Sequence, residues 1–354
     1  MDSTTSMSVK FRIADLADPI LSPLQAQVLT HAAKQSVRIE EEAILSAACK
    51  LTGLDDFGSD DFRPRLRAWI NALNQDQGLS VAGRFSAWNE MVRFASTRLY
   101  VEDCIRRNPG VLDMPIETPV VVAGLPRSGT TCLLQLLAGD RRLRSMPQWE
   151  VVRPVAAPYF VDGVDTRRDL SVAEWAQLDA TMPYLKMIHE FSPDYIAEDH
   201  DLQCLDFGSY CVEWLAEAPS WRDYYFSHDQ TSVYRYLRKT LQVMSWHSGP
   251  HCWVTKCPIH MEQLISVKTV LTGSTIAITH RDPVASIQSF VTGLAYSSRM
   301  LRKRVEPRRI ADYWIDRYER LLRACVRDRD ELDPALSQDV YFHDLMADPI
   351  AVLE

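Results

Sequence analysis

The stretch "PVVVAGLPRSGTTCLLQLLAG", Pro119 to Gly139, decides the fold of this chain. A β-branched run between a proline and a glycine predicts a short buried parallel strand over 119–124. The turn that follows leads into a helical pattern over 130–139. Backbone amides at such a strand–turn–helix junction converge on an anion at the start of the helix. The stretch therefore predicts a phosphate-binding loop.

The loop "GLPRSGTT" departs at one position from the loop of nucleoside triphosphate hydrolases. Gly124 and Gly129 have the spacing of G-x-x-x-x-G-K-[ST], but Thr130 stands where that motif has lysine. Without the lysine, a γ-phosphate and its magnesium ion lose their main cationic contact. Arg127 still supplies positive charge, and Thr130 and Thr131 add hydroxyl donors. The loop thus suits an anion that carries less charge than a triphosphate.

Further strand-like runs lie over 251–257, 274–280 and 338–345, with helical patterns between them. Strands that alternate with helices predict a parallel sheet with helices on both faces. We therefore expect an α/β fold with a P-loop-type parallel sheet, in a core that spans 111–354. The aromatic-rich, mainly helical stretch over about 155–250 is expected to be an insertion that forms an acceptor site or lid.

The residues before this core carry helical patterns. Apolar residues recur at helical spacing from about residue 20 to Gly53, and a second amphipathic helix ends at Asn108-Pro109-Gly110. No strand-like run precedes Pro119. We therefore expect an N-terminal helical region over 1–110.

Composition excludes several classes of protein. The chain has 354 residues, of which 46% are hydrophobic, and a net charge of −8. This balance disfavours binding to nucleic acid or to an anionic membrane surface. No window is apolar enough for a membrane span, which leaves only peripheral association, and the N-terminus lacks the apolar core of a signal peptide. We expect a cytoplasmic protein.

The cysteine pattern predicts neither disulfides nor a metal site. None of the eight cysteines forms a C-x-x-C pair, and Cys252 and Cys257 have no second pair to complete a zinc site. In a chain of this size without a secretory start, we expect reduced thiols. No cluster of metal ligands stands out elsewhere, so we expect no bound metal.

A second segment, "THRDPVASIQSF", suggests another anion contact. Arg281 ends a predicted strand, Asp282-Pro283 is a typical helix start, and Ser289 lies two turns into that helix. An arginine and a hydroxyl so placed can hold a second phosphate. Taken alone, a solvated Arg-Asp turn is the ordinary interpretation.

Together the two segments resemble the PAPS-dependent sulfotransferases, in particular the bacterial group whose loop reads P-R-S-G-T-T. Pro126 to Thr131 match that loop at every position, and the family's 3′-phosphate motif, an arginine followed eight residues later by a serine, falls on Arg281 and Ser289. The segment "VTKCPIH" is similar to the family's "LKSPxH" and places Lys256. A looser similarity covers "VYFHDLMADP", over 340–349. The 5′-phosphosulfate contacts implied by the resemblance are those of Arg127, Ser128, Gly129, Thr130 and Thr131.

The resemblance implies transfer of a sulfuryl group from 3′-phosphoadenosine-5′-phosphosulfate (PAPS) to a hydroxyl, with PAP as product and no metal. Charge on the departing phosphate oxygen must be stabilised, a task we assign to Arg127 and Lys256. A base must take the acceptor's proton. We expect Glu150, in "SMPQWEVVRP", because relatives carry a P-x-x-E or G-E-E segment there. The cluster Glu198-Asp199-His200 is the alternative.

The acceptor is expected to bind in the insertion. Aromatic residues are dense there, and at such density they are more often core than pocket. Those that do line a pocket would favour a phenol, a lipid alcohol or a glycolipid, with a carbohydrate hydroxyl also within the class. The aromatic residues are Trp149, Phe160, Trp175, Tyr184, Phe191, Tyr195, Tyr210, Trp214 and Trp221.

Two other functions stay open. A P-loop small-molecule kinase would need a cation in place of the loop lysine and an acidic magnesium ligand. A non-catalytic nucleotide-binding protein would bind PAP without turnover. Relatives continue through further helices after the last predicted strand, so an end at Glu354 suggests a short form or a truncated C-terminus.

Overall fold

The computed structural model describes residues 12–188, 192–249 and 251–353. Its main sheet has five parallel strands in the order β2-β5-β1-β6-β7. The predicted α/β class with a parallel sheet is thereby confirmed. The strands are β1 (Ile116–Gly124), β2 (Leu143–Arg144), β5 (His251–Lys256), β6 (Thr275–His280) and β7 (Ser337–Tyr341).

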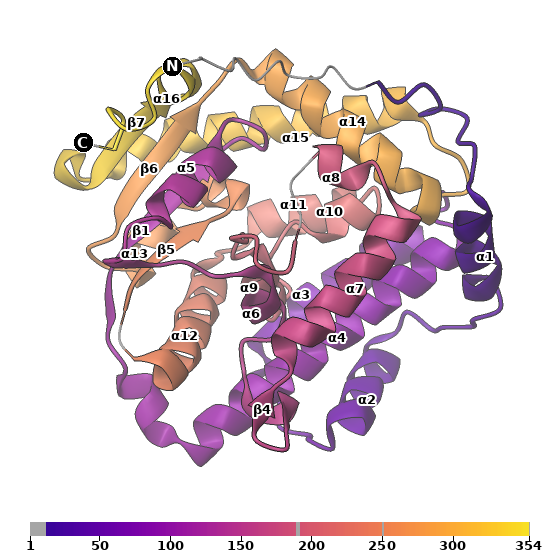
Figure 1. Cartoon of the computed structure of the whole chain (residues 1–354), viewed down its shortest axis with the longest axis horizontal. Helices are drawn as coiled ribbons and strands as arrows, with labels where there is room; N and C mark the ends of the chain where they lie inside the picture. Colours follow the sequence, from indigo (N-terminus) through magenta and orange to yellow (C-terminus); the bar gives the residue numbers. More distant parts are fainter. Residues whose placement is uncertain (1–11, 189–191, 250, 354) are drawn as a thin grey trace, which may run out of the picture.

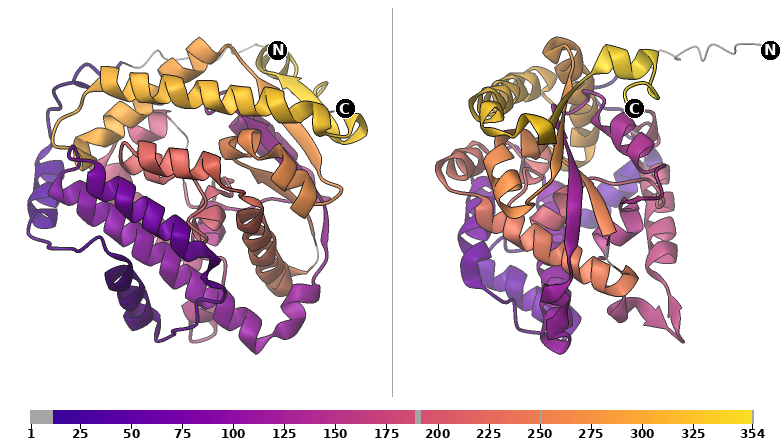
Figure 2. Two further views of the ribbon diagram at one scale, coloured as in Figure 1. Left: turned by 180° about the vertical axis from the view of Figure 1, so that it is seen from behind. Right: turned by 90° about the vertical axis from the view of Figure 1, so that its left-hand side faces the viewer.

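Helices cover both faces of the sheet (Figures 1 and 2). Helix α5 (Thr130–Leu137) lies on one face, while α13 (Leu264–Val270) and α15 (Pro307–Asp328) lie on the other. The alternation of side chains along β1 explains this arrangement. Val122 packs with Leu133 of α5, whereas Val121 belongs to the large core cluster on the opposite face.

Two predicted element boundaries are corrected. The run over 338–345 is strand only as far as Tyr341, and helix α16 (Phe342–Ala347) follows it. The run over 251–257 is strand only as far as Lys256, and a 3₁₀ turn (Pro258–Glu262) separates it from α13. Helix α14 (Pro283–Leu301) starts as predicted, because the Asp282 side chain accepts a hydrogen bond from the amide of Val284.

The N-terminal part consists of helices, with no strand in its described residues. All but the first of its four α-helices share one hydrophobic core with the sheet, to which Trp69, Phe94 and Val121 all belong. Buried ion pairs from Arg65 and Arg98 to Asp206 add polar links across this core. The helices are α1 (Pro23–Ala32), α2 (Glu41–Thr52), α3 (Arg63–Gln75) and α4 (Val81–Arg107).

The segment between β2 and β5 is mainly helical, as predicted, but it also contains a short antiparallel hairpin, β3 (Phe160–Val161) and β4 (Val164–Asp165). Phe191 lies outside the described residues. In the described part of the chain, no helix is both long and apolar enough to cross a membrane. The helices of this segment are α6 (Gln148–Val152), α7 (Arg167–Thr181), α8 (Leu185–Ile188), α9 (His200–Cys204), α10 (Val212–Leu215), α11 (Pro219–Ser227) and α12 (Thr231–Ser248).

Candidate active site

The loop between β1 and α5 has the backbone shape of an anion cradle. A side chain at Gly124 would place its Cβ 1.9 Å from Thr279 Oγ1, so only glycine fits there. Gly129 has φ 95° and Arg127 has φ 67°, both in the left-handed region. For arginine that conformation is strained, a feature concentrated at functional sites. The turn directs the first amides of α5, which lack acceptors within the helix, toward the loop.

Side chains from two other elements hold this loop in place. Ser128 Oγ donates to the Leu125 carbonyl at 2.7 Å and lies 2.5 Å from Thr279 Oγ1 at the end of β6. The Tyr318 hydroxyl, on α15, donates to the Pro126 carbonyl at 2.9 Å. The loop is therefore preorganised by the fold around it.

Two arginines and a serine converge at one end of the loop. Arg127 Nε donates to Ser289 Oγ at 3.1 Å, and Arg281 Nη1 donates to the Arg127 carbonyl at 2.6 Å. Burial and the nearby charge of Arg281 lower the pKa of Arg127. Within the described residues neither arginine forms an ion pair with an acid, and Arg281 stacks over the Phe342 ring at 4.0 Å. Two cations without counter-charge make this end suitable for a multiply charged anion.

At the other end of the loop lies Lys256, the last residue of β5. Its side chain is 1% exposed, and Nζ donates to Thr131 Oγ1 at 3.3 Å. Nζ also forms an ion pair with Glu198 Oε1. The structure thus brings Lys256 to the loop and places a carboxylate directly beside it.

Glu198 keeps one oxygen available. Its Oε2 atom is buried without a hydrogen-bond partner among the described residues, and the nearest imidazole atom, His200 Nδ1, is 3.6 Å away. Burial raises the pKa of Glu198, but the positive charge of Lys256 lowers it by more than burial raises it. The net pKa is therefore well below the usual range. The carboxylate is therefore ionised, and its Oε2 makes no hydrogen bond but faces the His200 imidazole.

Glu150, by contrast, is not brought to Lys256 by any described contact. It lies in α6 at 6% exposure, and both carboxylate oxygens accept hydrogen bonds from Arg144 Nη2, at 2.7 and 2.6 Å. Arg144 belongs to the edge strand β2. The contacts that the structure gives Glu150 are those of a buried ion pair at the sheet edge.

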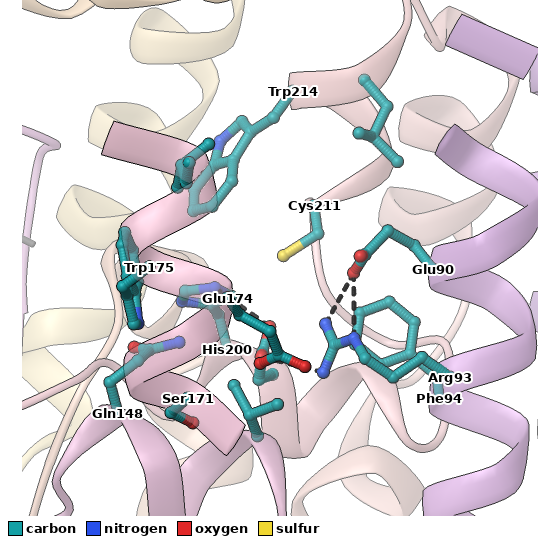
Figure 3. Close-up of a pocket in the computed structure, with 14 residues that line it drawn as sticks. Glu90, Arg93, Phe94, Gln148, Ser171, Glu174, Trp175, His200, Cys211 and Trp214 are labelled. Atoms are coloured by element: carbon teal, nitrogen blue, oxygen red, sulfur yellow. Dashed lines mark hydrogen bonds and ion pairs between the residues drawn. The ribbon is translucent and has the colours of Figure 1, made fainter. Parts of the chain in front are cut away.

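A cavity of about 410 Å³ opens between α4 and α7 (Figure 3). His200 and Asp201 at the start of α9 and Cys211 before α10 form its polar wall, and Arg93 of α4 completes it. His200 lines the cavity and also neighbours Glu198, which itself is not part of the lining. Its apolar lining residues are Phe94, Val152, Trp175, Leu178, Trp214 and Leu215.

Two predicted aromatic residues, Trp175 and Trp214, thus line the cavity, whereas Tyr210 and Trp221 are core residues with 0% exposure. The aromatic density of the sequence could not separate these groups. The sequence also does not predict that Tyr318 and Thr279 hold the loop in place, because both residues reach it from elements far along the chain.

The thiol of Cys211 has an unusual environment. Burial raises its pKa, but a hydrogen bond with Cys204 and the charge of His200 outweigh this and lower it to about 6. Burial likewise opposes protonation of His200, yet the surrounding Cys211, Asp201 and Glu198 raise its pKa well above the usual value. No motif in the sequence marks this cluster.

Comparison with known proteins agrees with this fold. None of the curated proteins compared with the chain matches it significantly. Sulfotransferase STF1 from Mycobacterium tuberculosis H37Rv superposes with a TM-score of 0.81 at 26% identity, over 89% of this chain and 87% of that one. Sulfotransferase STF9 from Mycobacterium avium shares the fold, with a TM-score of 0.81 at 22% identity, over 90% of this chain and 83% of that one. Residues 119–354 match the model of the sulfotransferase family, so the chain belongs to the sulfotransferase family.

Proposed function

We propose that this enzyme transfers a sulfuryl group from PAPS to the hydroxyl of an apolar acceptor held in the α4–α7 cavity. One observation carries the proposal: the loop residue Thr131 contacts Lys256, Lys256 pairs with Glu198, and Glu198 neighbours His200 on the cavity wall. This series of contacts runs from the anion cradle to the cavity without interruption. An in-line transfer requires the donor and the acceptor to meet, and this series of contacts links the places proposed for the two.

The donor fits the two ends of the loop. PAPS carries a 5′-phosphosulfate and a 3′-phosphate, and supplies the activated sulfuryl group. The amides at the start of α5, with Thr130 and Thr131, would hold the phosphosulfate, while Ser128 holds the loop through Leu125 and Thr279. Arg281 and Ser289 would hold the 3′-phosphate, which accounts for the lack of an acidic partner for Arg281 in the described residues.

Specific residues would then take the proton of the acceptor hydroxyl and stabilise the charge on the departing phosphate oxygen. As the sulfur–oxygen bond to the phosphate breaks, Lys256 beside Thr131 stabilises the negative charge on the departing oxygen, and Arg127 adds positive charge from the other end of the loop. As the new bond forms between sulfur and the acceptor oxygen, the hydroxyl proton passes to Glu198 Oε2. We favour Glu198 over Glu150 because Glu198 contacts Lys256, whereas both oxygens of Glu150 are occupied by Arg144.

The cavity favours a phenol or a lipid alcohol as acceptor. Trp175, Trp214 and Phe94 offer aromatic surface, and the volume of about 410 Å³ suits a small molecule. Charged residues of the lining are already paired: Arg93 with Glu90, and Glu174 with Arg153. An acceptor would therefore bind mainly through apolar contact, with its hydroxyl directed toward Glu198.

The proposal is tested by incubating the purified chain with PAPS and a panel of phenols, sterols and sugars, and measuring PAP release. Acceptor-dependent PAP formation with phenols or sterols, and its loss in the Glu198→Gln variant, is the expected result. PAP formation with sugars alone would overturn the acceptor class. PAP binding without turnover of any acceptor would support the non-catalytic alternative.

A further inference from the structure

Three metal-ligating side chains meet at the wall of the cavity. The imidazole of His200, the carboxylate of Asp201 and the thiol of Cys211 each offer a ligand atom, and the three atoms lie within 4.8 Å of one another. His200 Nε2 and Asp201 Oδ1 are 3.3 Å apart. In Figure 3 the Cys211 sulfur points into the cavity above His200. The arrangement arises because α9 begins at His200 and the chain returns at Cys211 after only one short turn.

We propose that His200, Asp201 and Cys211 form a binding site for a zinc-class divalent ion on the cavity wall. Nitrogen, carboxylate oxygen and thiolate are the ligands that zinc takes, at about 2.0–2.3 Å from the metal. Atoms that lie within 4.8 Å of one another can converge on one ion after small side-chain rotations. A hard ion such as magnesium would not select a set that contains sulfur and imidazole.

The surroundings of the three ligands suit a metal. Arg93 Nη1 contacts Asp201 Oδ2 at 3.2 Å, which leaves Oδ1 for the ion, and Glu90 already neutralises Arg93. Glu198 faces His200 Nδ1 and is paired with Lys256. The carboxylate of Asp201 and a thiolate at Cys211 therefore match the two charges of a divalent ion.

The groups behind the ligands also fit. Cys204 hydrogen-bonds with the Cys211 sulfur, and Ser209 Oγ lies 3.6 Å from it. Such outer partners orient metal ligands and are typical of metal sites. With three protein ligands, a tetrahedral ion keeps one open position. On this wall that position faces the cavity, where water or an oxygen atom of a bound molecule would fill it.

The site is tested by calorimetric titration of the reduced, metal-free full chain with zinc chloride. We expect one ion per chain and at least ~10-fold weaker binding in the Cys211→Ser variant, the scale on which changes at metal sites act. Cys104→Ser is the matched control, because Cys104 Sγ also lies near a histidine, 3.8 Å from His247 Nε2, away from the cavity. Binding that Cys211→Ser leaves unchanged, or no stoichiometric binding, would overturn the proposal.

A second measurement uses the unaltered chain, in case the variant does not fold. The chain is titrated with cobalt in place of zinc, because the absorption spectrum of bound cobalt depends on the type and number of its ligands. Intense visible bands of tetrahedral cobalt with a near-ultraviolet thiolate charge-transfer band are expected. The weak spectrum of octahedral cobalt, without that band, would contradict the assigned ligands.

Discussion

Lys256 Nζ and Glu198 Oε1 form an ion pair beside Thr131, in the first turn of the helix that follows the phosphate-binding loop. One side chain is suited to stabilise the leaving group and the other to take the proton of the acceptor. In the proposed mechanism this contact places both tasks of sulfuryl transfer at one position in the fold, and the following outcomes are expected.

Glu198→Gln should lower kcat by about 100- to 10,000-fold, the range of a lost general base. PAP binding should be retained, because the loop and Arg281 are unaltered. Steady-state kinetics together with PAP titration measure both quantities. Glu150→Gln is the matched control and should keep its activity. Loss of activity in the Glu150 variant, with full activity in the Glu198 variant, would return the base to Glu150.

Arg281→Ala should weaken PAP binding by about 2–5 kcal/mol, the cost of removing one partner of a buried charged contact. The readout that identifies the 3′-phosphate is a second titration with adenosine 5′-phosphosulfate, which lacks that group and should bind both proteins equally. Arg141→Ala, at an exposed arginine after α5, is the control. An equal loss for both nucleotides would show that Arg281 only supports the loop.

Trp175→Ala should raise the KM for the acceptor by roughly 10- to 100-fold. This range corresponds to the free energy of burying one large apolar side chain. The KM for PAPS should not change, since Trp175 lies on α7 and the donor is held by the loop. Trp246→Ala on α12, where the indole is 42% exposed and outside the cavity lining, serves as control. An unchanged acceptor KM would place the acceptor elsewhere.

Asp76→Asn tests how much one buried ion pair between the N-terminal helices and the sulfotransferase core stabilises the fold. Asp76, after α3, accepts two hydrogen bonds from Arg302, after α14, at 2.8 and 3.1 Å. Burial raises the pKa of Asp76, but Arg302 and the amides of Gly78 and Glu217 lower it below its ordinary 3.8. The ionised carboxylate of Asp76 therefore stabilises the folded state at pH values above the ordinary pKa of 3.8. This contribution is lost as the pH falls through the lowered pKa of the folded state.

At pH 7 the variant should lose about 3 kcal/mol of unfolding free energy, measured by urea denaturation, because Arg302 is left without its main partner. The difference from the unaltered chain should shrink in acid, where Asp76 itself becomes neutral. Asp60→Asn, at an exposed pair with Arg63, should cost less than about 1 kcal/mol. A pH-independent difference would contradict the role given to the carboxylate charge.

The parts of the fold that sequence predicts are those with local causes. The strand before Gly124, the loop and the start of α14 follow from β-branched runs, glycine and an Asp-Pro cap, all read over a few residues. The two-residue strand β2 is too short to carry a pattern. The break over 33–40, between α1 and α2, lies within one continuous helical pattern, so packing rather than periodicity decides it.

The site was predictable only as far as its motifs reached. Two motifs and a resemblance predict four site residues, and the structure brings them to one loop. They are Arg127, Arg281, Ser289 and Lys256. The partner of Lys256 could not be chosen, because Glu198 and Glu150 both precede it by many residues and only tertiary contact distinguishes them. The sequence likewise does not predict that Cys211 lies beside His200 and Asp201, because no known motif of metal ligands has this spacing.

The most direct test of the central claim is calorimetric titration with PAP and, separately, with ATP, each with and without magnesium. Tight PAP binding that is independent of magnesium, with weak ATP binding, is the predicted result, because two cationic ends of the loop match the two anionic groups of PAP. Magnesium-dependent binding of ATP in preference to PAP would contradict PAPS as the donor and favour phosphoryl transfer.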